Sequence, residues 1–448
     1  MATIEHERVR QTIFKRALSM TDQVSQAASD EEFIKLLKNS FNGRFIEDEN
    51  EKAPFLLDWR KRYKGNALAV VQPLTTQDVA AVVQCCLQHK VAIVPQGGST
   101  GLSGGSVPNP NDRAIVLSLV KLNQIRQVDI ANNTITVEAG CILENIQQQA
   151  LANDRLFPLS LASQGTCTIG GNLSSNAGGV QVLRYGNARA LCLGLEVVTA
   201  NGEIWNGLRG LRKDNTGYDL RDLFIGAEGT LGIITAAVLQ LSPLPKNKIV
   251  AWLAVNSIPD AVQLLALAQT QLHYGLSAFE LISKACLDLV LHHFQNSKSP
   301  LDKSSEWNIL LELSSSESTQ SAHHQLTVFL EKALEQGLIQ DGIISQSEQQ
   351  LKQLWSLREN ISEAQAREGK NIKHDVALPI SKIAEFVEST EKLLKQAFPE
   401  IQLICFGHLG DGNLHFNVSL KNSLKNPAAQ EQLLANQEAI NLITHNQV

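Results

Sequence analysis

The 448-residue sequence predicts an α+β protein of more than one domain. Three observations lead to this prediction. Short apolar runs typical of strands alternate with helical spacing along the chain. Two glycine-rich stretches follow such elements, at 95–105 and 164–179. Pro243-Leu244-Pro245 then interrupts the pattern, because two prolines cannot continue the preceding strand. We place an N-terminal helical segment at 1–62, a first domain at 63–243 and a second at 244–448.

The composition is that of a globular protein. Hydrophobic residues make up 43% and charged residues 19%, and the net charge of -6 argues against a nucleic-acid partner. No apolar stretch is long enough to cross a membrane, and the first 20 residues do not resemble a signal peptide. The seven cysteines are odd in number and form no C-x-x-C pair, so we expect buried thiols in a reducing compartment. We therefore expect a cytoplasmic protein.

The first domain begins with a strand near 67–71 and a helix that Thr75 and Asp78 cap. A second strand at 91–94 leads into the glycine-rich stretch Pro95-Gln96-Gly97-Gly98-Ser99-Thr100-Gly101-Leu102-Ser103-Gly104-Gly105. Backbone amides and hydroxyls of such a run can surround an anion such as a pyrophosphate. It lacks both the P-loop Lys-Ser/Thr pair and the Rossmann spacing. A flexible surface loop is the alternative reading.

Further strands are expected at 114–119, 127–130 and 134–139, and a helix follows over 142–150. The second glycine-rich stretch, QGTCTIGGNLSSNAGG at 164–179, again offers small residues where a flat or anionic ligand can approach the backbone. Asn201-Gly202 predicts a hairpin between strands at 193–199 and 203–205. In the second domain we expect strands at 249–255, 276–282 and 308–313, and helices at 261–271 and 320–336.

Four motifs in this order, PQGGSTGLSGG, TIGGNLSSNAGG, RYGNAR and DLFIGAEGTLGIIT, resemble the flavin-binding half of the vanillyl-alcohol-oxidase superfamily. Within it, the chain is similar to the branch of D-2-hydroxyglutarate dehydrogenase, D-lactate dehydrogenase and the glycolate oxidase flavoprotein subunit. The resemblance implies a two-part FAD-binding domain of the PCMH type and a ferredoxin-like, largely antiparallel cap. The pattern of elements alone would equally suit an α/β sheet.

The resemblance also implies which residues hold FAD. The pyrophosphate would lie against Gly97, Gly98, Ser99, Thr100, Gly101 and Leu102, and the flavin against Thr168, Gly171, Asn172, Ala177 and Gly178, with Ile233 contributing its backbone. Relatives often have Arg where this chain has Gln96, so the support of the loop differs. Members with covalent flavin often carry a His in this loop. This loop has none, so we expect non-covalent FAD.

The second domain carries two groups of candidate catalytic residues. His408 and His415, in GHLGDGNLHFNV, lie on either side of a predicted turn that can bring the two imidazoles together. A His pair alone is more often structural than metal-binding, but the resemblance implies a Zn or Mn site, with Asn417 beside it. Arg358, Ser362 and Lys373 match the set that binds the carboxylate in this branch. Arg358 and Ser362 would be neighbours on one helix.

The resemblance implies FAD-dependent oxidation of a D-2-hydroxyacid, with D-2-hydroxyglutarate as first choice and D-lactate or glycolate as alternatives. The acceptor would be an electron-transfer flavoprotein, a quinone or a cytochrome, which could bring the protein to a membrane surface. Relatives continue into a Ser-Ala-Glu-His-Gly segment, which this sequence does not reach before Val448. The alternative expectation is therefore an FAD-binding subunit or truncated remnant with little activity alone. It could form a homodimer or a complex with an iron–sulfur subunit.

Overall fold

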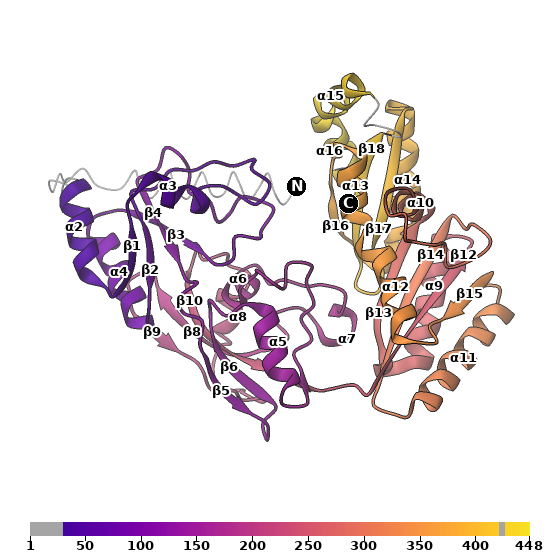
Figure 1. Ribbon diagram of the computed structural model, residues 1–448, viewed down its shortest axis with the longest axis horizontal. Coiled ribbons are helices and arrows are strands. Elements are labelled where there is room, and N and C mark those ends of the chain that lie inside the picture. The colour runs from indigo at the N-terminus through magenta and orange to yellow at the C-terminus, as the bar shows by residue number, and fades with distance from the viewer. Residues whose placement is uncertain (1–29, 421–425) are drawn as a thin grey trace.

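The computed structural model describes residues 30–420 and 426–448 and contains two units side by side (Figure 1). Residues 1–29 of the helical segment predicted at 1–62 lie outside the described residues. The first unit, drawn from indigo to magenta, holds two larger sheets and a two-stranded one, and the second, drawn from pink through orange to yellow, is built on one large sheet. The α+β prediction is confirmed. No described helix combines the length and apolar character needed to span a bilayer.

The first sheet has the order β1-β2-β4-β3. Strand β4 pairs in parallel with both β2 and β3, and helix α4 connects β2 to β3. Thr75 caps α4 as predicted, because its hydroxyl accepts a hydrogen bond from the backbone N–H of Asp78 at 3.1 Å. The elements are α2 (Asp30–Ser40), β1 (Gly43–Ile46), α3 (Glu49–Lys52), a 3-10 turn η1 (Ala53–Phe55), β2 (Val70–Pro73), α4 (Thr76–Gln88), β3 (Ala92–Gln96) and β4 (Ala114–Ser118).

The N-terminal segment is more than the helical preface that the sequence predicted. Phe33 and Leu37 of α2 are fully buried. The next residues form β1, which pairs antiparallel with β2 and extends the first sheet. This segment therefore belongs to the core of the first unit. The sequence signal was missed because β1 has only four residues and one buried side chain.

The second sheet is antiparallel, in the order β5-β6-β10-β8-β9. The predicted Asn201-Gly202 hairpin joins β8 to β9. The elements are β5 (Ile125–Asp129), β6 (Thr134–Glu138), α5 (Leu143–Leu151), β7 (Arg155–Leu156), α6 (Ile169–Ser174), α7 (Val182–Tyr185), β8 (Cys192–Thr199), β9 (Ile204–Asn206), α8 (Arg221–Phe224), β10 (Gly232–Gln240) and β11 (Ser242–Pro243). One continuous core connects both sheets and their helices.

The second unit is a seven-stranded sheet with the order β15-β12-β14-β13-β17-β18-β16. Every adjacent pair is antiparallel, which confirms the cap architecture over the α/β alternative. Its elements are β12 (Asn247–Val255), α9 (Ile258–Leu272), η2 (His273–Gly275), β13 (Leu276–Ser283), α10 (Lys284–His293), β14 (Trp307–Ser315), α11 (Thr319–Glu335), β15 (Asp341–Ile344), α12 (Glu348–Glu359), α13 (Ile361–Glu368), β16 (Asp375–Ala377), η3 (Ile380–Lys382), α14 (Ile383–Ala397), β17 (Ile401–His408), β18 (Asn413–Leu420), α15 (Pro427–Ala435) and α16 (Gln437–His445).

Alternating residues of this sheet enter two different cores. On one face, Ile249, Ala251 and Leu253 of β12 pack with α9, α11 and α14. On the other, Val250 and Trp252 pack with α10, α12 and α13. Because side chains alternate along a strand, the polar residues Glu280, His408 and His415 share this second face. We call it the site face. The seven cysteines, all described, are free and buried, as predicted.

Candidate active site

The two predicted glycine-rich stretches meet in the first unit. A β-carbon added to Gly97 would overlap the hydroxyl of Thr168, and one added to Gly98 would overlap the carbonyl oxygen of Thr166. Ser99 adopts the left-handed region at a φ of 50°. The loop after β3 can therefore lie this close to the second stretch only because it has glycine at 97 and 98. Gly101 and Leu102 lie at the exposed end of the loop.

Gln96 holds the base of this loop. Its side-chain amide is buried and donates to the carbonyl oxygens of Phe55 at 3.0 Å and Ser106 at 2.9 Å. Ser99 and Ser106 also share a hydrogen bond of 3.1 Å between their hydroxyls. The neutral amide of Gln96 thus connects the two ends of the loop.

The second glycine-rich stretch contains a short helix, α6, rather than an open loop. Thr168 precedes α6, and Asn172 is buried within it. Ala177 and Gly178 follow, and the N–H of Ala177 donates to the carbonyl of Asn172 at 2.8 Å. The hydroxyl of Thr168 is buried and has no hydrogen-bond partner among the residues that the structure describes. A buried hydroxyl without a partner is costly, so this position fits a group that accepts or donates a hydrogen bond there.

A cavity lies between the two sheets at the start of the loop. It measures about 200 Å³ and is lined on one side by Ile93 and Pro95 of β3 and on the other by Gly229, Gly232 and Ile233. Pro95, which lines this cavity, lies two residues before Gly97, where the loop meets the hydroxyl of Thr168. Small residues and backbone amides along such a site fit a dinucleotide such as FAD.

The predicted turn between β17 and β18 brings His408 and His415 together. The strands form a hairpin in which Phe406 faces His415, and the two imidazole centroids are 5.8 Å apart. His408 shares a hydrogen bond of 2.6 Å between its Nδ1 and Glu280 of β13, and the Nδ1 of His415 lies 3.2 Å from Asp375 of β16. Each carboxylate thereby orients one imidazole and leaves its Nε2 available.

Glu280 is a site residue that sequence reasoning missed. Its side chain is fully buried and also accepts a hydrogen bond from Arg358 Nε at 2.7 Å. Burial would raise the pKa of this carboxyl, but His408 and Arg358 outweigh that effect and lower it to about 2. Burial and the charge of Arg358 would lower the pKa of His408, but the carboxylate of Glu280 outweighs them and raises it. Arg358, Glu280 and His408 therefore form a charged chain across α12, β13 and β17.

The three predicted carboxylate-binding residues have different neighbours. Asn360 separates α12 from α13, so Arg358 and Ser362 do not share one helix, and that prediction is wrong. Arg358 is buried against Glu280 and Phe406, whereas Ser362 is exposed. Lys373 is exposed at the edge of β16. Asn417 is buried and donates to Gln365 of α13 at 2.9 Å.

Lys373 faces two arginines that come from the first unit. Arg60, Arg62 and Lys373 line one cavity of about 290 Å³ between the units. Lys373 is exposed as a whole, but partial removal of its ammonium group from water in this cavity, reinforced by the like charges of Arg60 and Arg62, lowers its pKa. Among the described residues, none of these three cations forms an ion pair within 4.0 Å. No sequence signal predicts this grouping, because more than 300 positions separate Lys373 from the two arginines.

Asp58 organises the loop that carries the two arginines. Its buried carboxylate accepts hydrogen bonds from the backbone N–H groups of Arg60 at 3.0 Å, Arg62 at 2.6 Å and Tyr63 at 2.7 Å. The carboxylate of Asp58 is thus hydrogen-bonded to backbone N–H groups of its own loop. The guanidinium groups remain available to an anionic ligand.

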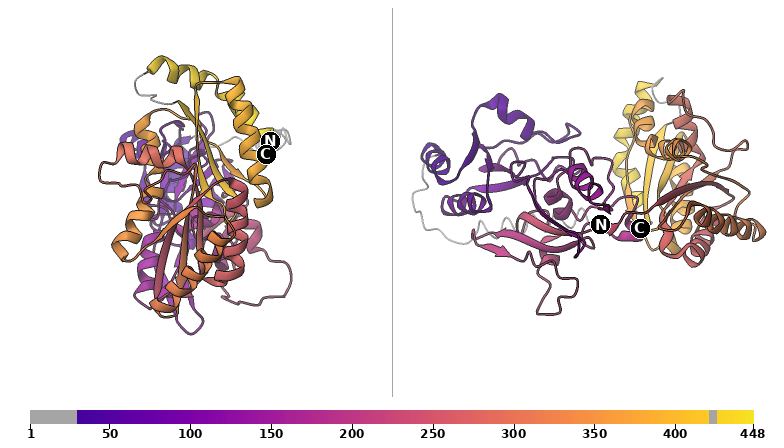
Figure 2. Two further views of the ribbon diagram at one scale, coloured as in Figure 1. Left: turned by 90° about the vertical axis from the view of Figure 1, so that its right-hand side faces the viewer. Right: turned by 60° about the horizontal axis from the view of Figure 1, so that its bottom comes forward.

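Helix α7 connects the flavin-lining stretch to the His pair. It starts three residues after Gly179, and Arg184 donates from Nη1 to the carbonyl of Ser314 in the cap at 2.8 Å. Leu183 packs against Gly410, where a β-carbon would come within 2.7 Å of the leucine side chain. Gly410 is two residues from His408. The candidate FAD site and the His pair are therefore neighbours across the interface that Figure 2 shows from two further sides.

Comparisons with known proteins agree with this geometry. A model described as "FAD binding domain" matches residues 67–207, and one described as "FAD linked oxidases, C-terminal domain" matches residues 244–441. The chain belongs to the FAD-linked oxidase family. The expectations of FAD and of an FAD-dependent 2-hydroxyacid dehydrogenase are confirmed at the level of this family.

Named relatives of this family member cover most of the chain. A mitochondrial D-2-hydroxyglutarate dehydrogenase of Bos taurus is 39% identical over 389 residues, which are 87% of this chain and 70% of the relative. A D-2-hydroxyglutarate dehydrogenase of Xanthomonas citri is 40% identical over 361 residues, 81% of this chain and 75% of the relative. A putative mitochondrial D-lactate dehydrogenase of Schizosaccharomyces pombe is 38% identical over 376 residues, 82% and 71% of the two chains.

Solved structures share the fold. p-Cresol methylhydroxylase with bound substrate superposes with a TM-score of 0.70 at 15% identity, covering 92% of this chain and 86% of that one. Alkyldihydroxyacetonephosphate synthase superposes with a TM-score of 0.70 at 16% identity, covering 93% and 80%. The expectation of a cytoplasmic location is contradicted, because relatives from Bos taurus, Arabidopsis thaliana and Danio rerio are named as mitochondrial.

Proposed function

We propose that this chain oxidises D-2-hydroxyglutarate to the 2-oxoacid, with D-lactate as the second candidate substrate. The observation that carries the choice of a dicarboxylate is the group of Arg60, Arg62 and Lys373, three cations without an acidic partner among the described residues. A substrate with one carboxylate would need fewer such groups. The names of the relatives from Bos taurus and Xanthomonas citri support the same order of substrates.

The first unit would hold FAD between its sheets. Gly97 and Gly98 let the loop lie against the second glycine-rich stretch, and Thr168 has a buried hydroxyl to offer the ligand. FAD supplies, when bound, the acceptor for the hydride that leaves the 2-carbon of the substrate. The contact of Leu183 with Gly410 fixes the flavin-lining stretch next to the site face of the cap.

The second unit would bind and orient the hydroxyacid. His408 and His415 fit two ligands of a divalent metal, Zn or Mn, because each has its Nδ1 beside a carboxylate and its Nε2 available. Such a metal lowers the pKa of a coordinated hydroxyl. Asn417 lies on the same face, and its amide is fixed by Gln365. Lys373 with the two arginines would hold the distal carboxylate in the crevice between the units.

The nature of the electron acceptor is a separate proposal. An electron-transfer flavoprotein, a quinone or a cytochrome could each reoxidise the flavin. Turnover with an artificial acceptor tests the hydroxyacid chemistry without depending on that choice. Loss of turnover with every acceptor, despite bound FAD, would favour the alternative of an FAD-binding subunit that needs partners.

The experiment that tests the dicarboxylate assignment compares two substrates in one variant. Arg60→Ala and Lys373→Ala should each raise KM for D-2-hydroxyglutarate roughly ten- to a hundredfold, because a charge-assisted hydrogen bond contributes about 1.5–3 kcal/mol. KM for D-lactate should change little. Lys61→Gln is the matched control, since Lys61 lies between the two arginines but does not line the cavity. Equal effects on both substrates would show that the three cations do not select a dicarboxylate.

A further inference from the structure

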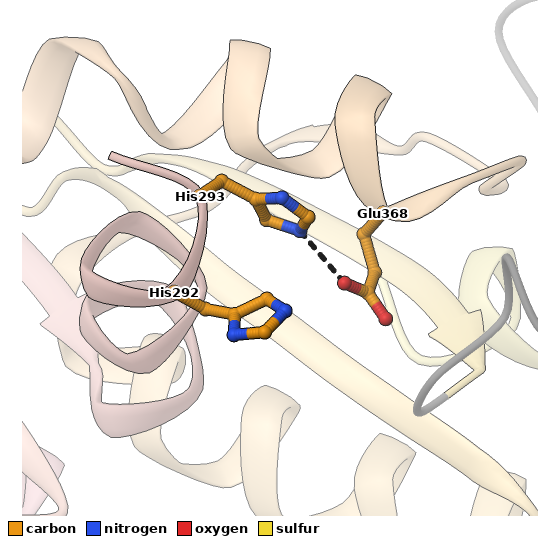
Figure 3. Close-up of side chains that lie close together, drawn as sticks. All are labelled: His292, His293 and Glu368. Carbon is orange, nitrogen blue, oxygen red and sulfur yellow. Dashed lines mark hydrogen bonds and ion pairs between the residues drawn. The ribbon is translucent and has the colours of Figure 1, made fainter. Parts of the chain in front are cut away.

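A second group of potential metal ligands lies in the cap, outside the site just described. His292 and His293 end helix α10, and Glu368 ends helix α13 (Figure 3). One ligand atom from each residue lies within 4.8 Å of the other two. Among the residues that the structure describes, this is the one group of three His, Cys, Asp or Glu side chains that meets this distance.

The ends of the two helices that carry these side chains are joined by a hydrogen bond. Arg367, next to Glu368, donates from Nη1 to the carbonyl of His293 at 3.0 Å, and its guanidinium lies 4.4 Å from the ring of Phe294. Arg367 also pairs with Glu363 through Nε at 3.1 Å. The last turn of α13 is therefore attached to the end of α10. The charge of Arg367 is directed towards Glu363 and the carbonyl of His293.

The group combines a shielded pair with an accessible third residue. His293 Nε2 lies 2.7 Å from Glu368, and only 13% of each of these side chains is exposed. His292 is exposed, and its ring lies 4.8 Å from that of His293 in a T-shaped arrangement. An ion can therefore reach the group from the side of His292, and a water molecule can complete its coordination.

The residue types and distances suit a transition-metal ion. Two imidazoles and one carboxylate form a ligand set that binds Zn²⁺ in proteins, with each ligand atom about 2.0–2.2 Å from the ion. Tetrahedral geometry at that distance separates ligand atoms by roughly 3.4 Å, so side-chain shifts of about 1 Å would suffice. Affinity for such nitrogen and oxygen ligands rises from Mn²⁺ towards Cu²⁺.

From this geometry we infer that His292, His293 and Glu368 bind a divalent transition-metal ion, with Zn²⁺ as the expected occupant. The site lies at the ends of α10 and α13 and uses none of the residues assigned to the substrate, the flavin or the His408–His415 pair. Its occupation would cross-link the two helix ends. This role is independent of the proposed oxidation reaction.

Zinc titration of the purified holoprotein tests the inference. The background is His408→Ala/His415→Ala, which removes the other candidate ligands so that calorimetry reports on this site. We expect one Zn²⁺ to bind to the background protein. Adding either His292→Ala or Glu368→Gln to this background should weaken zinc binding at least tenfold. Zn²⁺ should also raise the melting temperature of the background protein but not that of the two added variants.

The control is His324→Ala in the same background. Like His292, His324 is exposed, lies in a helix (α11) and is next to a second histidine, His323. His292→Ala changes an exposed side chain, so its circular dichroism spectrum should match that of the background. Equal zinc affinity in His292→Ala, Glu368→Gln and His324→Ala would overturn the inference. So would the absence of any zinc binding in the background protein.

Discussion

Replacing Glu280 by Gln should be the most damaging single change in the cap. Glu280 is fully buried and is hydrogen-bonded to both Arg358 and His408. Gln keeps the size of the side chain but leaves the guanidinium of Arg358, which is 7% exposed, without a counter-charge. Removing one partner of a buried ion pair typically costs about 3–5 kcal/mol. We expect the free energy of unfolding to fall by roughly that amount near pH 6.

The pH dependence of this loss follows from the two pKa shifts. The folded pKa of Glu280 lies at about 2, below its usual 4.5, so its contribution is present above pH 4.5 and is lost as pH falls towards 2. That shift corresponds to roughly 3 kcal/mol. The pKa of His408 is raised above 6.5, so its contribution is present below pH 6.5 and is lost as pH rises through the raised value. The difference between wild type and variant should therefore be largest between pH 4.5 and 6.5.

Urea unfolding, followed by circular dichroism at a series of pH values, measures this difference. Glu312→Gln is the matched control, because Glu312 is also buried but accepts its hydrogen bonds from the neutral groups of Ser277 and Trp355. Its effect should be smaller than that of Glu280→Gln at pH 6. A difference between wild type and Glu280→Gln that stays constant from pH 2 to 6.5 would refute the assignment of this charged chain.

Three further predictions concern the two candidate sites. Gly97→Ala should lower the amount of FAD that copurifies, because the added β-carbon would overlap Thr168. Gly101→Ala is the control and should keep its FAD, because an added β-carbon would have no atom within 4 Å. Equal flavin absorbance in the two variants would contradict this prediction. Thr168→Val should leave the apoprotein as stable as wild type or more so, yet weaken FAD binding, because it removes a buried hydroxyl that has no partner within residues 30–420 and 426–448. His415→Ala should reduce turnover by at least about tenfold with unchanged FAD content, as metal-ligand loss predicts; unchanged turnover would remove His415 from the site.

The sequence predicted those features that depend on neighbouring residues. The Thr75 cap, the Asn201-Gly202 hairpin and the approach of His408 to His415 each arise within a few positions and are confirmed. The resemblance supplied what periodicity could not, namely the antiparallel pairing of the cap strands.

The features that were missed depend on contacts between distant positions. Glu280 looks like one polar residue in an apolar strand until β17 pairs with β13 and places His408 beside it, 128 positions later. The helix expected over Arg358 and Ser362 is interrupted at Asn360. This break was missed because no strong breaker such as proline marks the change between α12 and α13. Arg60 and Arg62 approach Lys373 only when the two units come together.

Anaerobic reduction of the bound flavin by a single substrate tests the central claim most directly. The holoprotein is mixed with D-2-hydroxyglutarate in a stopped-flow instrument, and the visible absorbance of oxidised FAD is followed without any electron acceptor. The account predicts rapid loss of this absorbance with D-2-hydroxyglutarate, much slower loss with the L enantiomer, and formation of one 2-oxoglutarate per flavin reduced. Fully bound FAD that stays oxidised with D-2-hydroxyglutarate, D-lactate and glycolate would contradict it.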